Sequence, residues 1–195
     1  MVFQYYNYLI NMRFIVLIII LINFVSLGTS AEEIRMSFNK ESAKYWGYIS
    51  DRTMGGISNG QAFLDEDKNN IFARLTGNVS TKNNGGFIQL RSTLPFLDIN
   101  NLEKELRGVR LNTKGNGETY HIFIRTSKTR SYSDFYYATF IANEEWKIVD
   151  LPFNEFKHRF SNSVLDGNDI QTFGIVAYGR DFYSDVSVSE IIFYF

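Results

Sequence analysis

Two acidic runs are the first candidates for chemistry, because a pair of carboxyl groups can act as general acid and general base. Asp65, Glu66 and Asp67 are consecutive, and Glu144 and Glu145 are adjacent. Both runs lie in polar, turn-like stretches next to lysine or asparagine, where solvated loop charges are the usual state. We therefore expect neither run to be catalytic.

The two histidines offer a second route to catalysis, through a Ser-His-Asp triad. His121 lies inside a well-defined strand pattern, and His158 lies in a polar Lys-His-Arg stretch. A triad needs its three members to meet in space, with the nucleophile held at an exposed turn. No such constellation is evident, so we expect both histidines to be structural or surface residues and the protein not to be an enzyme.

Metal, thiol and nucleotide chemistry lack suitable residues. The chain has no cysteine, which excludes disulfides, thiol nucleophiles, iron–sulfur ligation and cysteine zinc sites, and two histidines leave little for an all-histidine site. There is no Walker motif and no full dinucleotide fingerprint, since Gly115 and Gly117 are only two glycines before a strand. We therefore expect no cofactor and no metal.

Composition indicates a folded protein that does not bind nucleic acid. The 195 residues are 45% hydrophobic, and 20 basic against 21 acidic residues give a net charge of -1, without the basic excess of a nucleic-acid binder. A small basic patch, Arg125 with residues 127–130, precedes Tyr132, Tyr136 and Tyr137. We interpret it as a hairpin loop with a tyrosine-rich strand behind it.

The elements that position these residues are strands. Apolar and polar residues alternate repeatedly after residue 32, whereas helical spacing over three turns is hard to find. About nine strands are predicted: 34–38, 71–75, 86–91, 109–112, 120–125, 135–141, 146–149, 172–178 and 186–195. Short helices are expected at 97–106 and 151–156. The pattern predicts an all-β protein, an antiparallel sandwich or jelly roll over residues 32–195.

The N-terminal segment reads as an export signal. Residues 14–25 are apolar except for Asn23, which is the length of a signal-peptide core and too short for an ordinary membrane span. Arg13 supplies the positive flank, and Thr29 and Ala31 are small residues at the -3 and -1 positions. The alternative is an uncleaved membrane anchor that begins near Tyr5. A mitochondrial presequence is less favoured, because such segments are amphipathic and arginine-rich.

Two features of the mature chain point to binding. The loop 46–60 has a double glycine, where the backbone can turn sharply, while Asp51 and Ser58 can satisfy loop amides. Arg110 and Arg125 stand at alternating strand positions and are expected to line one face of a sheet. Arginines on a sheet face need either acidic neighbours or an external polar ligand, and the sequence leaves both open.

Several motifs in a fixed order carry a resemblance to a known family. They are Trp46, Asp-Arg-Thr-Met-Gly-Gly-Ile-Ser at 51–58, Asn-Gly-Gly-Phe at 84–87 with Arg91, residues 108–111 and 115–120, Trp146, Leu-Pro-Phe-Asn-Glu-Phe at 151–156, residues 173–175 and the last strand, 188–193. Over about residues 36–194 the chain resembles the complex I intermediate-associated protein 30 family. The resemblance implies a galactose-binding-like jelly roll.

The same resemblance suggests a function. The best-known members are similar to assembly chaperones of respiratory complex I in mitochondria, and an export signal does not fit that location. A second departure is Asn116, where the family commonly has aspartate. The resemblance is therefore a better guide to the fold of this chain than to its function. We expect a non-enzymatic, chaperone-like assembly factor that binds a protein partner and is exported or membrane-tethered.

The alternative is a carbohydrate-binding module of the galactose-binding-like type. In that case Trp46, Tyr120, Tyr136 and Tyr137 would stack on sugar rings, and Arg110 and Arg125 would bond to hydroxyl groups. The residues expected to bind a partner or ligand are Trp46, Asp51, Arg52, Met54, Gly55, Gly56, Ser58, Arg91, Arg110, Tyr120 and Arg125.

N-terminal sequencing of the protein from its native compartment tests the export signal. Cleavage after Ala31 is expected to leave Glu32 as the first residue, because small residues occupy the -3 and -1 positions before it. An intact N-terminus recovered in the membrane fraction would favour the anchor instead.

Overall fold

The structure is a computed structural model that describes residues 33–94 and 102–195. The expected signal at 1–31 and most of the helix expected at 97–106 lie outside these residues. Within the described ranges, no helix is long and apolar enough to cross a membrane.

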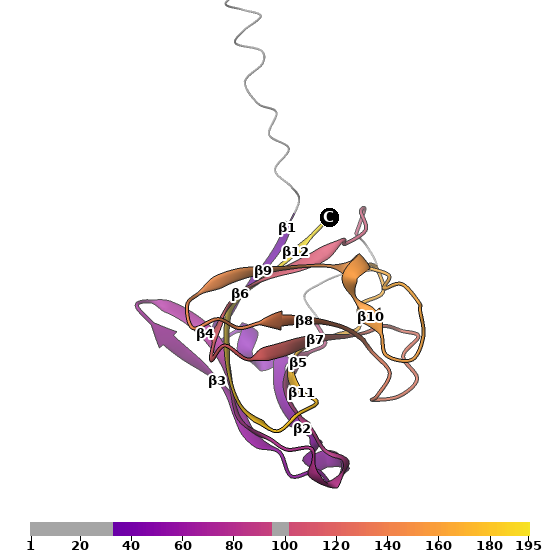
Figure 1. Ribbon diagram of the computed structural model, residues 1–195. Helices are drawn as coiled ribbons and strands as arrows, with labels where there is room; N and C mark the ends of the chain where they lie inside the picture. The colour runs from indigo at the N-terminus through magenta and orange to yellow at the C-terminus, as the bar shows by residue number, and fades with distance from the viewer. Residues whose placement is uncertain (1–32, 95–101) are drawn as a thin grey trace, which may run out of the picture. The chain divides into compact units, whose positions relative to one another are not determined.

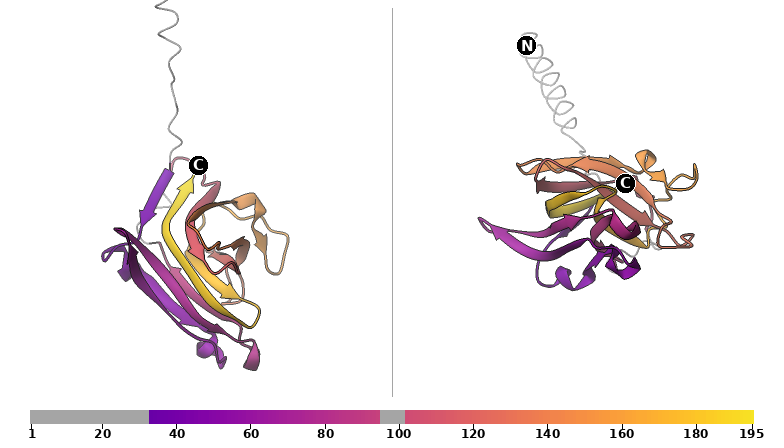
Figure 2. Two further views of the ribbon diagram at one scale, coloured as in Figure 1. Left: turned by 60° about the vertical axis from the view of Figure 1, so that its left-hand side comes forward. Right: turned by 60° about the horizontal axis from the view of Figure 1, so that its bottom comes forward.

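The fold class predicted from the sequence is confirmed, because two six-stranded antiparallel sheets pack face to face (Figure 1 and Figure 2). Sheet A contains β1 (Glu33–Ser37), β3 (Asn59–Asp67), β4 (Asn70–Val79), β6 (Gly108–Gly115), β9 (Lys147–Pro152) and β12 (Phe182–Tyr194). Sheet B contains β2 (Trp46–Ser50), β5 (Phe87–Ser92), β7 (Thr119–Arg125), β8 (Tyr136–Ile141), β10 (Lys157–His158) and β11 (Thr172–Tyr178).

Strand order is not sequence order. Sheet A runs β3-β4-β12-β6-β9, with β1 also paired to β12, and sheet B runs β10-β8-β7-β11-β5-β2. The long strand β12 pairs with β4 through its first half and with β1 through its second half, while β6 follows its other edge. The pairing with β6 shifts register between Val188 and Glu190.

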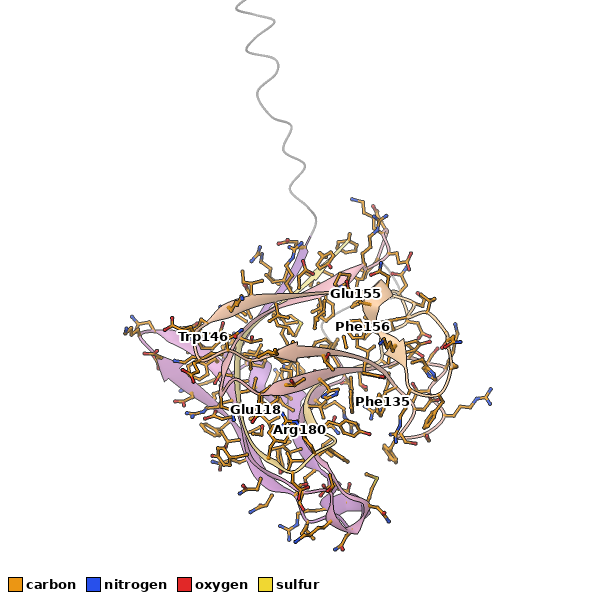
Figure 3. All side chains as sticks on the ribbon, viewed as in Figure 1. Glu118, Phe135, Trp146, Glu155, Phe156 and Arg180 are labelled. Atoms are coloured by element: carbon orange, nitrogen blue, oxygen red, sulfur yellow. The ribbon has the colours of Figure 1, made fainter. Side chains whose placement is uncertain are left out.

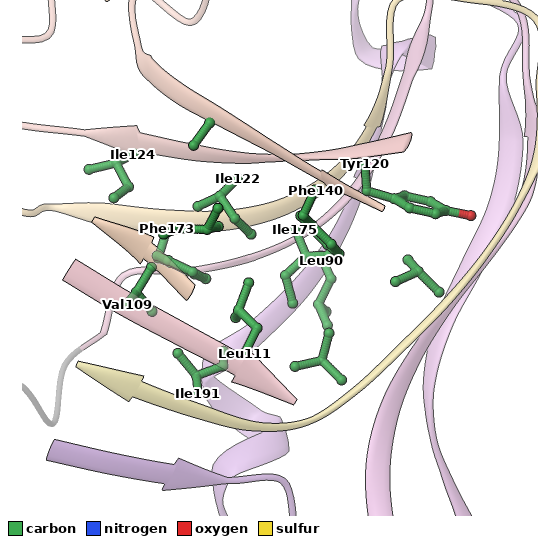
Figure 4. Packing of buried hydrophobic residues seen from close by; sticks show 14 of the residues in the cluster. Leu90, Val109, Leu111, Tyr120, Ile122, Ile124, Phe140, Phe173, Ile175 and Ile191 are labelled. Carbon is green, nitrogen blue, oxygen red and sulfur yellow. The ribbon is translucent and has the colours of Figure 1, made fainter. Parts of the chain in front are cut away.

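The inward-facing residues of both sheets form one core. Val109 and Leu111 of β6 lie opposite Ile122 and Ile124 of β7, and all four are fully buried (Figure 4). Much of the aromatic content lies here too, as in the edge-to-face contact of Phe173 with Phe193, whose ring centroids are 5.6 Å apart. Burying this alternating set is the main force that stabilises the sandwich.

Some sequence-predicted elements were incomplete or wrong. The strands β2, β3 and β10 were missed, and Asp65, Glu66 and Asp67, expected in a turn, lie in β3, where Asp65 pairs with Arg74. The helix expected at 151–156 is a single 3-10 turn, η5 (Phe153–Glu155), because Leu151 and Pro152 still belong to β9. Residues 102–106 contain no helix.

One buried carboxylate joins two loops that follow strands of different sheets. Asp51 begins the 3-10 turn η2 (Asp51–Met54) after β2, and its side chain is fully buried. It accepts hydrogen bonds from the Ser58 amide (3.0 Å), the Ser58 hydroxyl, the Gly86 amide (2.6 Å) and the Phe87 amide (3.1 Å). Burial alone would raise the pKa of the Asp51 carboxyl. The hydrogen bonds have the larger combined effect, so the pKa lies below its usual value.

Glycines of the sequence motifs at 51–58 and 84–87 make room for this carboxylate. A Cβ at Gly56 would lie 2.4 Å from Asp51 Cγ, and a Cβ at Gly85 would lie 2.5 Å from Asp51 Oδ2. Gly55 instead has a φ of +90°, which side chains disfavour, with open space around it. We call Asp51, Ser58, Gly56, Gly85 and Gly86 the Asp51 clamp.

Glycine substitutions separate the two reasons for the double glycine. Gly56→Ala is expected to lower the free energy of unfolding by about 2–4 kcal/mol through its clash with Asp51, and Gly55→Ala by about 1 kcal/mol through backbone strain. Gly47→Ala is the control, because a Cβ there meets nothing within 4 Å. Urea denaturation measures all three. Equal stability of the Gly56 and Gly47 variants would contradict the clamp.

Candidate functional site

The face of sheet B that points away from the core carries an unusual set of side chains. The register aligns Gly47, Arg91, Gly174, Phe123 and Tyr137 in one row across five strands. The neighbouring rows add the other members. We call the following residues the sheet B face: Phe87, Gln89, Arg91, His121, Phe123, Arg125, Phe135, Tyr137, Thr172, Gly174, Val176 and Tyr178.

Aromatic rings make up much of this face. Phe123 and Phe135 stack with ring centroids 3.8 Å apart, and Tyr178 contacts the edge of Phe123 at 5.1 Å. The Tyr137 ring lies 6.4 Å from Phe135. Figure 3 shows Phe135 toward one end of β7, with Arg180 and Glu118 together toward the other. The two tyrosines are only partly buried, so a ligand can reach their rings.

His121 stands among these rings. Its imidazole lies 5.4 Å from the Tyr178 ring and 5.9 Å from the Phe123 ring, and its Nδ1 is buried without a hydrogen-bond partner. Burial, helped by the positive charge of Arg180, lowers the pKa of His121 to about 4. The ring is therefore neutral at physiological pH, and its Nδ1 makes no hydrogen bond.

Arg125 is the most unusual cation of the face. It is 9% exposed, its Nη2 donates to the Tyr132 carbonyl at 2.7 Å, and its Nε and Nη1 are buried without a partner. Its guanidinium lies 5.6 Å from the centre of the Phe135 ring. Burial and the nearby charge of Arg91 lower the pKa of Arg125 to about 10, against a smaller effect of Asp134, so the side chain stays charged at neutral pH.

Arg110, expected on the same face as Arg125, lies on the other sheet. Its Nη1 donates to Glu33 at 2.7 Å and its Nε to Asp150 at 3.1 Å, both on the outer side of sheet A. The first alternative, acidic neighbours, therefore holds for Arg110 but not for Arg125. Arg110 has acidic neighbours, and Arg125 has no carboxylate hydrogen bond among the described residues.

Unpaired buried polar atoms gather on the sheet B face. In the described part of the chain, six buried side-chain N or O atoms have neither a hydrogen bond nor an ion pair, and five of them lie here. They are Gln89 Oε1, His121 Nδ1, Arg125 Nε, Arg125 Nη1 and Thr172 Oγ1. Buried polar atoms are normally hydrogen-bonded, and exceptions mark strain, function or bound water. A polar ligand is one way to satisfy them.

The other residues expected to bind are scattered. Tyr120 is fully buried, with its hydroxyl donating to Asn116 Oδ1 and accepting from the Asp185 amide, so it is not placed to stack on a sugar ring. Tyr136 is also buried. Trp46 packs against Phe38 with ring centroids 5.2 Å apart.

The loop that carries the sequence signature is divided between the clamp and solvent. Asp51, Gly56 and Ser58 make the Asp51 clamp, whereas Arg52 and Met54 are exposed. Residues 56–60 also match the Gly-x-Ser-x-Gly pattern of hydrolases, which the sequence reasoning overlooked. Ser58 is fully buried, its hydroxyl donates to Asp51, and a strand follows it, so it does not form an exposed nucleophile turn.

Sequence reasoning missed Gln89, Thr172 and His121 as site residues, although it chose Arg91 and Arg125. Alternation placed Gln89 and His121 on the polar side of their strands, but only the strand order brings β5, β11 and β7 together. No group of three His, Asp or Glu residues that could hold a metal occurs within 33–94 and 102–195.

Comparisons with known proteins identify the family and the fold. Residues 36–184 match the family model described as Complex I intermediate-associated protein 30. No curated protein sequence matches the chain.

Several solved structures share the fold. The family 11 carbohydrate-binding module of cellulosomal cellulase Lic26A-Cel5E of Clostridium thermocellum has a TM-score of 0.66 at 16% identity, covering 85% of this chain and 95% of its own. The same module in complex with a β-1,3-1,4-mixed-linked tetrasaccharide gives 0.65 at 16% identity, with 85% and 96% covered. A family 30 module gives 0.55 at 14% identity, with 82% and 98% covered.

The buried His121 predicts a pH dependence of stability. Because its pKa is about 4 in the folded protein and about 6.5 when unfolded, the unfolded state binds the proton first as the pH falls. The stabilising contribution of the neutral His121 is therefore fully present above about pH 6.5 and is lost as the pH falls toward 4. Between pH 7 and pH 5 the wild type should lose on the order of 1–2 kcal/mol more than His121→Gln, measured by urea denaturation. Parallel losses would contradict the burial of a neutral imidazole.

Proposed function

The chain belongs to the complex I intermediate-associated protein 30 family, and we propose that it is a non-catalytic binding domain that holds an oligosaccharide on the sheet B face. The observation that carries the proposal is the set of five buried, unpaired polar atoms among aromatic rings, three of which are only partly buried. Sugar rings need both kinds of group, because their C–H surfaces stack on aromatic rings and their hydroxyls need hydrogen-bond partners.

The shape of the domain supports the same proposal. Carbohydrate-binding modules share its fold, and one of them is described in complex with a tetrasaccharide. At 16% identity this likeness concerns the fold alone, so the ligand argument comes from the residues of this chain. We further propose that the protein is exported, as the segment 1–31 predicts, which would place the face where extracellular glycans occur.

A protein partner is the second candidate, and the loop next to the Asp51 clamp favours it. Met54 is 57% exposed and Ile57 is 48% exposed, on the same short loop as the exposed Arg52. Methionine and arginine are enriched in protein interfaces. This surface agrees with the assembly-factor role suggested by the family, and it does not use the sheet B face.

Isothermal titration calorimetry after a glycan-array screen tests the first candidate. Tyr137→Ala is expected to weaken binding of any glycan that the array identifies by about tenfold or more, because it removes a stacking surface. Ile148→Ala is the matched control, since Ile148 is 63% exposed on sheet A. If the array finds no glycan, or if both variants bind equally, the carbohydrate proposal is wrong.

Crosslinking in native membranes tests the second candidate. A double substitution, Met54→Asp with Ile57→Asp, is expected to abolish capture of a protein partner, because it places charge in the apolar contact. Tyr132→Asp is the control, because Tyr132 is 79% exposed on another loop. Equal capture by the wild type and the double variant would remove this loop as the interface.

A further inference from the structure

We propose that the saccharide bound by the sheet B face is acidic, and that one of its carboxylates lies between Arg91 and Arg125. This inference rests on the proposed function and names the chemical class of its ligand. It is carried by the positions of the two arginines, by the absence of a protein carboxylate between them in the described residues, and by the bare backbone beside Arg91.

Charge pairing separates these two arginines from several others in the domain. Arg74 pairs with Asp185 at 2.8 Å, and Arg180 pairs with Glu118 at 2.6 Å. Arg110, as described above, pairs with two carboxylates. Arg91 has no side-chain hydrogen bond or ion pair with any described residue, and Arg125 bonds only to a backbone carbonyl. The arginines on strands of sheet A thus have carboxylate partners, whereas the two on strands of sheet B have none within the described ranges; Asp134, the acidic residue whose charge acts on Arg125, is itself paired with His158.

The strand register places the two arginines on either side of β11. Arg125 lies beside Thr172, and Arg91 lies beside Gly174, two residues further along the same strand. Strands two apart in a sheet are separated by about 10 Å, and the two-residue offset adds about 7 Å along the strand, so the two Cα atoms lie about 12 Å apart, which two arginine side chains can span. Their proximity is felt electrostatically, because the charge of Arg91 helps to lower the pKa of Arg125.

The space beside Arg91 is not filled by neighbouring side chains. Its two neighbours in the row are Gly47 and Gly174, so bare backbone lies on both sides of it. A Cβ at Gly47 would meet nothing within 4 Å, and one at Gly174 would first meet Gln89 Oε1 at 3.2 Å. Gly47 is exposed whereas Gly174 is buried, so a ligand group can approach Arg91 closely from the Gly47 side.

The remaining groups favour a sugar acid over other anions. A carboxylate can accept charge-assisted hydrogen bonds from Arg91, which is only partly buried, and the buried positive charge of Arg125 attracts it from the other side of β11. Gln89 Oε1 is an acceptor and needs a donor, which a sugar hydroxyl supplies. An acidic peptide would bring carboxylates without a ring hydroxyl for Gln89 or a stacking surface matched to Tyr137 and Tyr178. An acidic saccharide supplies all three.

Matched charged and uncharged ligands test the inference. The probes are tetrameric oligouronates of galacturonic, glucuronic, mannuronic and guluronic acid, each with its methyl ester, which removes the charge and keeps the ring. We expect at least one free acid to bind about tenfold or more tightly than its ester, with affinity falling as salt rises from 50 to 500 mM. Calorimetry on the full protein measures this.

Variants then place the carboxylate. Arg91→Met should abolish the preference for the acid over the ester, and Arg91→Lys should retain part of it, because lysine keeps the charge and loses the bidentate geometry. Arg107→Met is the control, since Arg107 is exposed before β6 in sheet A. Circular dichroism of each variant checks that it is folded, and the partly active lysine variant keeps the test valid if the methionine variant unfolds.

The outcomes separate this inference from the proposed function. If acid and ester bind equally, or if neutral glycans bind more tightly than the acids, the ligand is not acidic and the inference is wrong. The proposed function would still stand in either case, provided that Tyr137→Ala abolishes the binding. Binding of polyglutamate without any saccharide, or no binding of any glycan, would overturn both. A preference for the acid that survives Arg91→Met in a folded protein would overturn the assignment of the carboxylate to these arginines.

Discussion

The buried carboxylate of Asp51 is the interaction on which the arrangement of the binding face depends. It follows β2 and receives amide hydrogens from the start of β5, so it joins two strands at the edge of sheet B. Ser58, just before β3, adds two further donors and connects this edge to sheet A. A buried charge is tolerated only when its hydrogen bonds are complete, which explains why glycine must stand at positions 56 and 85. Through β2 and β5, the same interaction holds Gly47, Gln89 and Arg91 in register.

The two outer faces of the sandwich differ in how their charges are satisfied. On sheet A, Arg110 and Arg74 are neutralised by acidic residues of other strands in the same sheet, an arrangement complete without a ligand. On sheet B, Arg125, His121 and Gln89 keep unpaired polar atoms beside aromatic rings. Leaving such atoms buried and unpaired costs stability, and that cost is a common property of binding sites, where the partner completes the hydrogen bonds.

Much of the fold follows from local sequence, whereas the site depends on long-range pairing. The apolar patterns of 120–125 and 172–178 predicted β7 and β11, because every second side chain of each strand packs into the main core. The strand β3 was missed because its acidic end resembles a turn, whereas its pairing with β4, together with the ion pair of Asp65 and Arg74, keeps that end in the sheet. Tyr120 and Arg125 were both expected to bind, although the alternation over 120–125 places them on opposite faces of the strand, and Tyr120 lies in the core. No local pattern states that β5 lies beside β11, so the meeting of Gln89, Arg91 and Arg125 was not predictable.

The central claim is that this domain binds its ligand on the outer face of sheet B. The most direct measurement is a residue-resolved NMR titration of the isotope-labelled protein with the tightest-binding oligosaccharide. The account predicts that the largest shifts occur at Gly47, His121, Tyr137 and Gly174, and that the Met54–Ile57 loop and the strand β9 stay unchanged. Shifts confined to that loop or to sheet A, with the sheet B face unaffected, would contradict it.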